Sequence, residues 1–77
     1  MAASEADRLA EELVEFLRRR RVKPGDMIAI AAVRENFCRF SHRPVEFVLA
    51  LEAGVRNGLL VLSADGQWLA LRDEPTQ

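Results

Sequence analysis

The residues of this sequence best suited to chemistry lie in a basic turn near its middle. Arg39, Ser41, His42 and Arg43 stand immediately before a stretch with helical character that opens at Pro44. Arginine can pair bidentately with guanine, and a serine hydroxyl or the amide groups at a helix end can hold a phosphate. A polar surface turn without any ligand accounts for the same residues equally well. The pattern therefore leaves a nucleic-acid contact and a solvated turn open as alternatives.

Cys38 and His42 are a second group of residues suited to chemistry, and they stand four positions apart. A zinc site needs more ligands than one cysteine and one histidine supply, and a Cys–His nucleophile pair needs an orienting group and a pocket. The sequence also has no phosphate-binding loop and no sign of a paired-carboxylate cleft. We therefore predict no catalytic residue, no metal site, no cofactor and no small-molecule substrate, and the chain is not expected to be an enzyme. A buried thiol beside a turn histidine is the expected arrangement.

The charge distribution along the chain is more informative than its net charge of −1. Residues 18–43 hold eight basic and two acidic residues, a balance of +6. Residues 1–17 and 44–77 have balances of −4 and −3. The middle third could therefore form a basic face on an otherwise acidic protein. The arginines at 18–21, with Lys23, could contact phosphates. Alternatively they form a solvated helix end, because basic side chains there complement the helix dipole.

Length and composition indicate one small globular domain over residues 1–77, with a polar tail at 73–77. Apolar residues make up 49% of the chain, which excludes a disordered protein. No apolar run approaches the roughly 18 residues that a membrane-spanning helix requires, so we expect no membrane partner. The acidic N-terminus has no apolar signal core and Cys38 cannot form an internal disulfide, which together favour a cytoplasmic location.

The first two helices are predicted from capping residues and apolar spacing. Ser4 is a good N-cap for a helix over about Glu5–Arg20, along which apolar residues recur at three- and four-residue steps. A second helix is predicted over about Ile30–Phe37. The segment Met27–Ala29 before it is either a short strand or a lead-in at which Asp26 caps the second helix.

A third helix is predicted to open at Pro44, which suits the first helical position, and to stop before Gly58. On a helical wheel, one apolar face is expected to contact the core: Pro44, Val48, Leu51 and Val55, with Phe47 beside them. The opposite face is expected to be exposed: Glu46, Ala50, Ala53 and Asn57, flanked by Leu49 and Arg56. Alanines on an exposed face offer little to base edges and suit close packing against another protein.

An antiparallel hairpin follows, folded at Asp65-Gly66 between two apolar runs. A two-residue turn there pairs Ser63 with Trp68 and places alternate side chains on opposite faces. The core face is expected to contain Leu60, Leu62, Leu69 and Leu71. Val61, Trp68 and Ala70 share the other face and form an apolar patch of the kind that marks a protein interface. The alternative is that the first helix covers this patch within the monomer.

Three helices followed by a two- or three-stranded antiparallel hairpin give an α+β fold with the element order of a winged helix. Four motifs carry the comparison further: Pro24-Gly25-Asp26, Ser41-His42-Arg43-Pro44-Val45, Ala50-Leu51 and Gly58-Leu59. In this order they resemble the winged-helix DNA-binding domains of GntR-type transcription regulators, over about Val22–Leu71. The resemblance implies a recognition helix that starts at Pro44, a wing formed by the hairpin, and double-stranded DNA as the partner.

Two functions are therefore expected as alternatives. The first is a small DNA-binding protein, a transcription regulator acting as a dimer, whose contact surface is Arg34, Arg39, Ser41, His42, Arg43, Arg56 and Asn57. The second is a protein-interaction module or homodimer without a nucleic-acid role, whose interface is Leu49, Ala50, Ala53, Val61, Trp68 and Ala70. The hairpin tip, Ala64-Asp65-Gly66-Gln67, has no arginine to press against DNA, which favours the second function.

Overall fold

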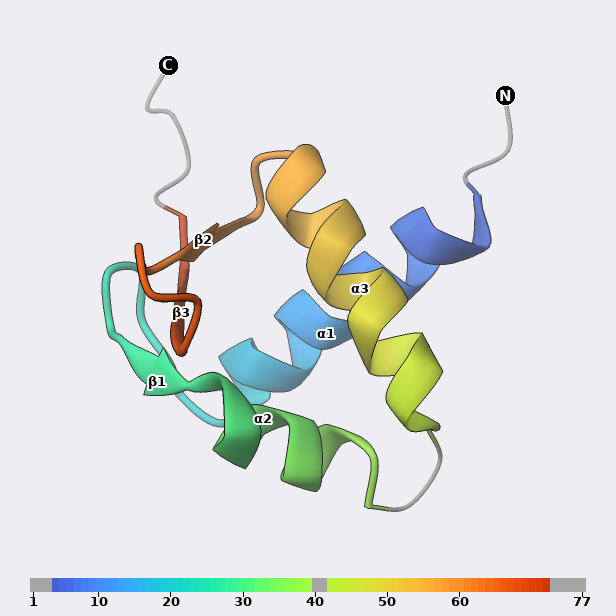
Figure 1. The fold of residues 1–77 in the computed structure, drawn as a ribbon, viewed down its shortest axis with the longest axis horizontal. Helices are drawn as coiled ribbons and strands as arrows, with labels where there is room; N and C mark the ends of the chain where they lie inside the picture. The colour runs from blue at the N-terminus through green and yellow to red at the C-terminus, as the bar shows by residue number, and fades with distance from the viewer. Residues whose placement is uncertain (1–3, 40–41, 73–77) are drawn as a thin grey trace.

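The computed structural model describes residues 4–39 and 42–72 of the 77-residue chain. Within these ranges the chain is a mixed α+β fold, in which three helices lie beside a three-stranded antiparallel sheet (Figure 1). The elements are, in chain order, α1 (Glu5–Arg19), β1 (Ile28–Ala29), α2 (Ile30–Phe37), α3 (Pro44–Arg56), β2 (Leu60–Leu62) and β3 (Trp68–Leu71). Each of the three helices expected from the sequence is present, within about one residue of its expected ends.

Helix α1 begins at the expected cap. The Ser4 hydroxyl oxygen accepts a hydrogen bond from the Asp7 amide at 3.1 Å, and Ser4 itself has extended backbone angles. Acidic residues lie in the first turn of α1 and arginines in its last turn, as the helix dipole favours. One side of α1 is buried along its length: Leu9, Ala10, Leu13, Val14 and Leu17. Helix α3 packs against α1 more extensively than any other two elements of the described chain pack together.

The orientation of α3 about its own axis is the main difference from the sequence prediction. Ala50, Ala53 and Gly54 are buried. Val48 and Val55, which were expected in the core, are 48% and 39% exposed. The expectation that Ala50 and Ala53 face outward is therefore wrong. Because the distance between two packed helices depends on the side chains at their contact, small residues on the inner side let α3 lie close to its neighbours.

The sheet has the order β1-β3-β2, with both neighbouring pairs antiparallel. The hairpin register predicted from the sequence is confirmed: Leu60 pairs with Leu71, Val61 with Ala70, and Leu62 with Leu69. The open question about residues 27–29 is settled in favour of a strand, since Ile28 pairs with Leu69 and Ala29 with Trp68. Asp26 does not cap α2; its carboxylate accepts a hydrogen bond from the Lys23 amide at 3.1 Å.

The hairpin turn is longer than the two-residue turn expected at Asp65-Gly66. The Gly66 amide donates to the Ser63 carbonyl at 2.9 Å, so the turn is centred one residue earlier, and the loop covers residues 64–67. Side chains stabilise this loop: the Trp68 amide donates to the Ser63 hydroxyl and the Gln67 amide donates to the Asp65 carboxylate, each at 3.1 Å. Gly66 has the positive φ, 72°, that the sequence prediction required.

The core lies between the buried sides of the helices and the inner face of the sheet. Leu60, Leu69 and Leu71 lie on that inner face, as expected. Leu62, expected beside them, is 37% exposed, because it is the last residue of β2 and lines a surface groove with Val55 instead. Among the helices of the described ranges, none combines the length and the apolar composition that a membrane span requires.

The buried contact between Gly54 of α3 and Leu60 of β2 gives a stability prediction. A β-carbon at position 54 would lie 2.5 Å from the Leu60 Cδ1 atom and 3.0 Å from its Cγ atom. Leu60 is 2% exposed, so its side chain has little room to move away. We expect Gly54→Val to lower the free energy of unfolding by about 1–3 kcal/mol, measured by urea denaturation.

A double-mutant cycle isolates the cause of that loss. If the clash with Leu60 is responsible, the Gly54→Val/Leu60→Ala variant will lose less stability than the two single variants added together. Strictly additive losses would show that Gly54 is required for a different reason.

Candidate interaction surface

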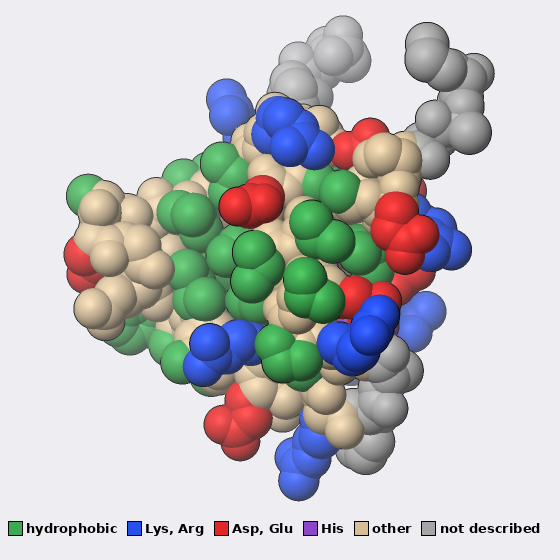
Figure 2. All heavy atoms as spheres, turned by 45° about the vertical axis from the view of Figure 1, so that its right-hand side comes forward, with side chains coloured by type: hydrophobic (Ala, Val, Ile, Leu, Met, Phe, Trp, Pro, Cys, Tyr) green, Lys and Arg blue, Asp and Glu red, His purple; other side chains and the backbone are tan. Residues whose placement is uncertain are grey.

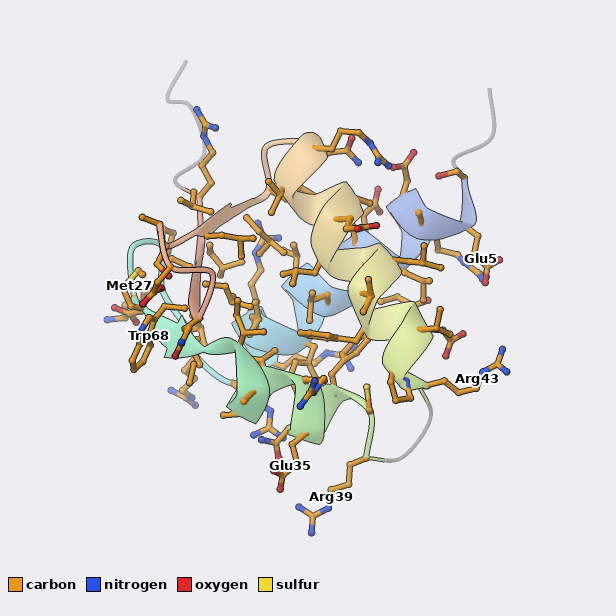
Figure 3. All side chains as sticks on the ribbon, in the orientation of Figure 1. Glu5, Met27, Glu35, Arg39, Arg43 and Trp68 are labelled. Carbon is orange, nitrogen blue, oxygen red and sulfur yellow. The ribbon has the colours of Figure 1, made fainter. Side chains whose placement is uncertain are left out.

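The basic residues predicted to contact nucleic acid do not gather at one place. Arg39 and Arg43 project in different directions on either side of the connection to α3 (Figure 3), and Ser41 lies outside the described residues. Arg34 is exposed on α2 and lines a groove with Gln67 and Trp68 at the β1 side of the molecule. The segment with a charge of +6 is therefore spread over several sides of the fold.

His42 has an internal role between α1 and α2. Its Nε2 atom lies 2.8 Å from the Glu12 carboxylate, in a pair whose histidine side chain is 21% exposed. Its ring stacks on the Phe37 ring with a centroid distance of 4.1 Å. These contacts attach the residues that lead into α3 to the side of α1. The groove beside this pair is also lined by Arg8 and by Arg19, whose side chains form ion pairs with acidic residues of α1 itself.

Arg56 and Asn57, at the far end of α3, are also engaged within the protein. The Asn57 side-chain amide donates a hydrogen bond to the Asp7 carboxylate at 2.8 Å, and the Arg56 guanidinium lies 3.8 Å from the same oxygen. The hydrogen bond from Asn57, followed by that from the Ser4 hydroxyl, lowers the pKa of the Asp7 carboxyl below its ordinary value. This contact joins the end of α3 to the start of α1, so the primary role of Asn57 in the structure is an internal one.

Five of the exposed residues of α3 lie on one side of the helix, and we call them the α3 stripe: Val45, Val48, Leu49, Glu52 and Val55. Its four apolar members are 56%, 48%, 38% and 39% exposed, in chain order. These spacings of three and four residues place the side chains on one side of the helix. Figure 2 shows hydrophobic side chains gathered over the middle of this face, with charged side chains among and around them.

A groove lined by Leu51, Glu52, Val55, Arg56 and Leu62 continues the α3 stripe toward β2. Exposed apolar side chains that form one continuous patch are typical of a site where another macromolecule binds. Leu49, which was expected at a protein interface, lies on this surface. Ala50 and Ala53, expected beside it, do not, because both point into the protein with no exposed area.

The outer face of the sheet is a second apolar surface. Trp68 and Val61 are 43% and 44% exposed. The alternative prediction, in which the first helix covers these two side chains, is therefore wrong. Ala70 is 5% exposed and is therefore not part of the accessible patch; it lies in the central strand of the sheet and pairs with Val61 of β2. Met27, which is 52% exposed, directly precedes β1 and is drawn on the same side of the molecule as Trp68 in Figure 3, belongs to this surface instead.

Met27 was missed because the sequence left the segment before α2 undecided between strand and lead-in. Once Ile28 is paired with Leu69, the alternation of side chains along a strand places Met27 on the outer face. The apolar residues Met27–Ala29 were therefore compatible with a strand, but the face on which Met27 lies could be predicted only after the pairing of Ile28 with Leu69 was known. In the described ranges, no cluster of three or more histidine, cysteine or acidic side chains could hold a metal ion.

The contact between Asp7 and Asn57 predicts a pH-dependent contribution to stability. Because the folded-state pKa of Asp7 is lowered, its contribution is present above the unfolded-state pKa, about 4, and is lost as the pH falls through the folded-state value. We expect Asn57→Ala to reduce the thermal midpoint at neutral pH and the difference from the unsubstituted protein to shrink on acidification. Asn36→Ala is the matched control, since the Asn36 amide donates to the Ala32 carbonyl and involves no carboxylate. A deficit of Asn57→Ala that does not change with pH would contradict this assignment.

The described residues therefore present two apolar surfaces, on α3 and on the outer face of the sheet, and contacts at both ends of α3 that hold it to α1. No family model, no curated protein and no solved structure matched the chain. The function proposed below depends on the geometry of these surfaces.

Proposed function

We propose that this chain is a winged-helix module that binds another protein through the α3 stripe. The order helix, strand, helix, helix and hairpin, with a sheet in the order β1-β3-β2, is compatible with a winged helix. In a helix-turn-helix protein that binds DNA, the recognition helix presents polar side chains to the major groove. The position of α3 in the chain corresponds to that helix, so the chemistry of its exposed side decides between the alternatives.

The observation that supports a protein partner is the composition of the α3 stripe. Valine and leucine side chains supply no hydrogen bond to a base edge and no charge to a phosphate. Glu52 lies among them and would repel the DNA backbone. Removing the same apolar side chains from water against another protein is favourable. A partner surface with complementary apolar groups is therefore the best fit.

The other elements of a DNA-binding winged helix also lack suitable groups. The hairpin tip carries Asp65, whose carboxylate accepts a hydrogen bond from the Gln67 amide, and no basic residue. Arg56 and Asn57 contact Asp7 at the end of α3 that lies farthest from Arg43. With α3 about 20 Å long, these groups cannot act together with Arg43 on one pair of bases.

The first test measures binding to DNA. A labelled random duplex is titrated with the protein at low and at moderate salt, alongside Val48→Glu. We expect at most a weak affinity that disappears as salt increases and does not depend on Val48, because the dispersed arginines supply only counterion release. Binding that persists at moderate salt and is abolished by Val48→Glu would place DNA on the α3 stripe and contradict the proposal.

The second test detects the protein partner directly. A photo-reactive amino acid replaces Val48 in the full chain, within cells that naturally produce the protein, and the control carries it at the exposed Glu35 of α2. We expect a discrete covalent adduct with a protein from position 48 that is absent from position 35 and is lost when Val55→Lys is added. Equal labelling from both positions, or adducts with nucleic acid only, would refute the proposal.

A further inference from the structure

The end of helix α1 has a basic surface that the function proposed above does not use. It consists of the four consecutive arginines at positions 18–21 and of Lys23, all of them exposed, and we call it the α1 basic cluster. The acidic residues next to it along the chain are Glu15 and Asp26. Because its members follow one another in the sequence, they stay together at one end of one helix, unlike the arginines of α2 and α3.

Helix α1 ends in a Schellman motif, in which the residue just beyond the helix takes a positive φ. The Arg21 amide donates a hydrogen bond to the Arg18 carbonyl at 2.9 Å. The Val22 amide donates to the Leu17 carbonyl at 3.1 Å, which completes the motif. Arg21 accordingly has a φ of 64°. This left-handed region is unfavourable for a residue with a β-carbon, and glycine is the usual choice.

Helix α3 ends in the same motif and provides a comparison within the chain. The Gly58 amide donates to the Val55 carbonyl at 3.1 Å, and the Leu59 amide donates to the Gly54 carbonyl at 2.8 Å. Gly58, with a φ of 77°, occupies the position that corresponds to Arg21. Among the described residues, the two other positive φ values also belong to glycines, so Arg21 alone has a side chain in this conformation.

No internal contact of the Arg21 side chain explains this exception. The side chain is exposed, and it forms no ion pair, hydrogen bond or ring contact within the part of the chain that the structure describes. Its charge adds little to the helix dipole, because Arg18 and Arg19 already lie in the last turn of α1 and the effect falls off beyond that turn. Backbone strain that no internal contact explains is typical of residues that act in binding.

The neighbouring arginines have local contacts that leave their charge at the surface. The Arg19 guanidinium lies 3.5 Å from the Glu15 carboxylate, and 79% of its side chain is exposed. The Arg20 guanidinium lies over the Phe16 ring, 4.7 Å from its centroid. Val22, the apolar residue within this segment, packs against the core. The α1 basic cluster is therefore a cationic surface without an apolar side chain of its own to insert into a bilayer.

From these observations we infer that the α1 basic cluster, with Arg21 as a member, binds the phosphate groups of a nucleic acid without reading its bases. A planar guanidinium matches the geometry of a phosphate, and an exposed arginine supplies it without an internal partner to displace. The inference goes beyond the proposed function and does not depend on it, since the cluster lies outside the α3 stripe. The chain then holds a protein through α3 and a nucleic acid through the end of α1.

The test removes the arginine from the strained position. R21G, R21K and the unsubstituted protein are compared in thermal melts and in titrations of a labelled random duplex, and of a single strand of the same length, at several low salt concentrations. Because glycine accepts a positive φ, we expect R21G to raise the thermal midpoint by about 2–4 °C. Because R21G removes a phosphate contact, we expect its affinity to fall about threefold or more at low salt, and the slope of log affinity against log salt to decrease by about one.

R21K keeps both the charge and the strained backbone, so its thermal midpoint and salt slope should stay close to those of the unsubstituted protein. R43G is the matched control, because it exchanges an exposed arginine whose φ is −95° for glycine. We expect R43G to bring no rise in the thermal midpoint and no change in the salt slope. A gain in stability together with a loss of binding, confined to R21G, is a result that a purely structural role of Arg21 would not produce.

Four outcomes would overturn the inference. The first is that the unsubstituted protein binds neither nucleic acid at low salt. The second is that R21G binds with unchanged affinity and salt slope, and the third is that R43G loses as much binding as R21G. The fourth is that vesicles containing phosphatidylserine bind the protein and lose it on R21G while neither nucleic acid binds, which would assign the α1 basic cluster to a membrane surface. None of these outcomes bears on the α3 stripe, which the photo-reactive group at position 48 tests separately.

Discussion

The close contact of α3 with α1 and β2, made through alanine and glycine, is the constraint on which the remaining structure depends. Because Ala50, Ala53 and Gly54 face inward, α3 lies close to the elements that it packs against, and the Leu60 side chain packs against Gly54. The same orientation leaves Val45, Val48, Leu49 and Val55 on the surface, whereas Phe47 is buried and Leu51 packs against the core. The exposed apolar stripe is thus a geometric result of how the core packs.

Polar contacts at both ends of α3 fix this orientation. At one end, His42 pairs with Glu12 of α1 and stacks on Phe37; at the other, Asn57 donates to Asp7 near the start of α1. Two points of attachment prevent a helix from rotating as well as from sliding. Residues that the sequence identified as contacts for nucleic acid therefore help to determine which residues α3 can present to a partner.

The sequence allowed the elements of the fold to be predicted well because their signals are local. The Ser4 cap and the proline at position 44 each act within a few residues. The hairpin register was predicted correctly, although the turn is centred one residue before Asp65-Gly66. The buried face of α3 could not be predicted in the same way. Both of its faces are apolar, so hydrophobicity does not distinguish them, and the choice depends on the space that another helix leaves.

The candidate site could be predicted only in part, for a related reason. Val61 and Trp68 were identified because alternation along a strand is regular, whereas the burial of Ala70 depends on its place in the central strand of the sheet. The basic residues form a cluster in the sequence but lie on separate elements in space. A run of charge along a chain indicates a shared surface only if the fold brings its members together, and the side chains of Arg39 and Arg43 project in different directions (Figure 3).

The division of α3 into a buried side and an exposed apolar side has a consequence for how this surface can change during evolution. Substitutions at Val45, Val48 or Val55 alter what the helix presents without creating a cavity in the core, whereas substitutions at Ala50 or Gly54 disturb packing. Substitutions on the exposed side of α3 can therefore change which partners the helix binds, while selection for a stable fold constrains the residues on its buried side. A scaffold with this separation is well suited to acquire new partners by gradual replacement of surface valines and leucines.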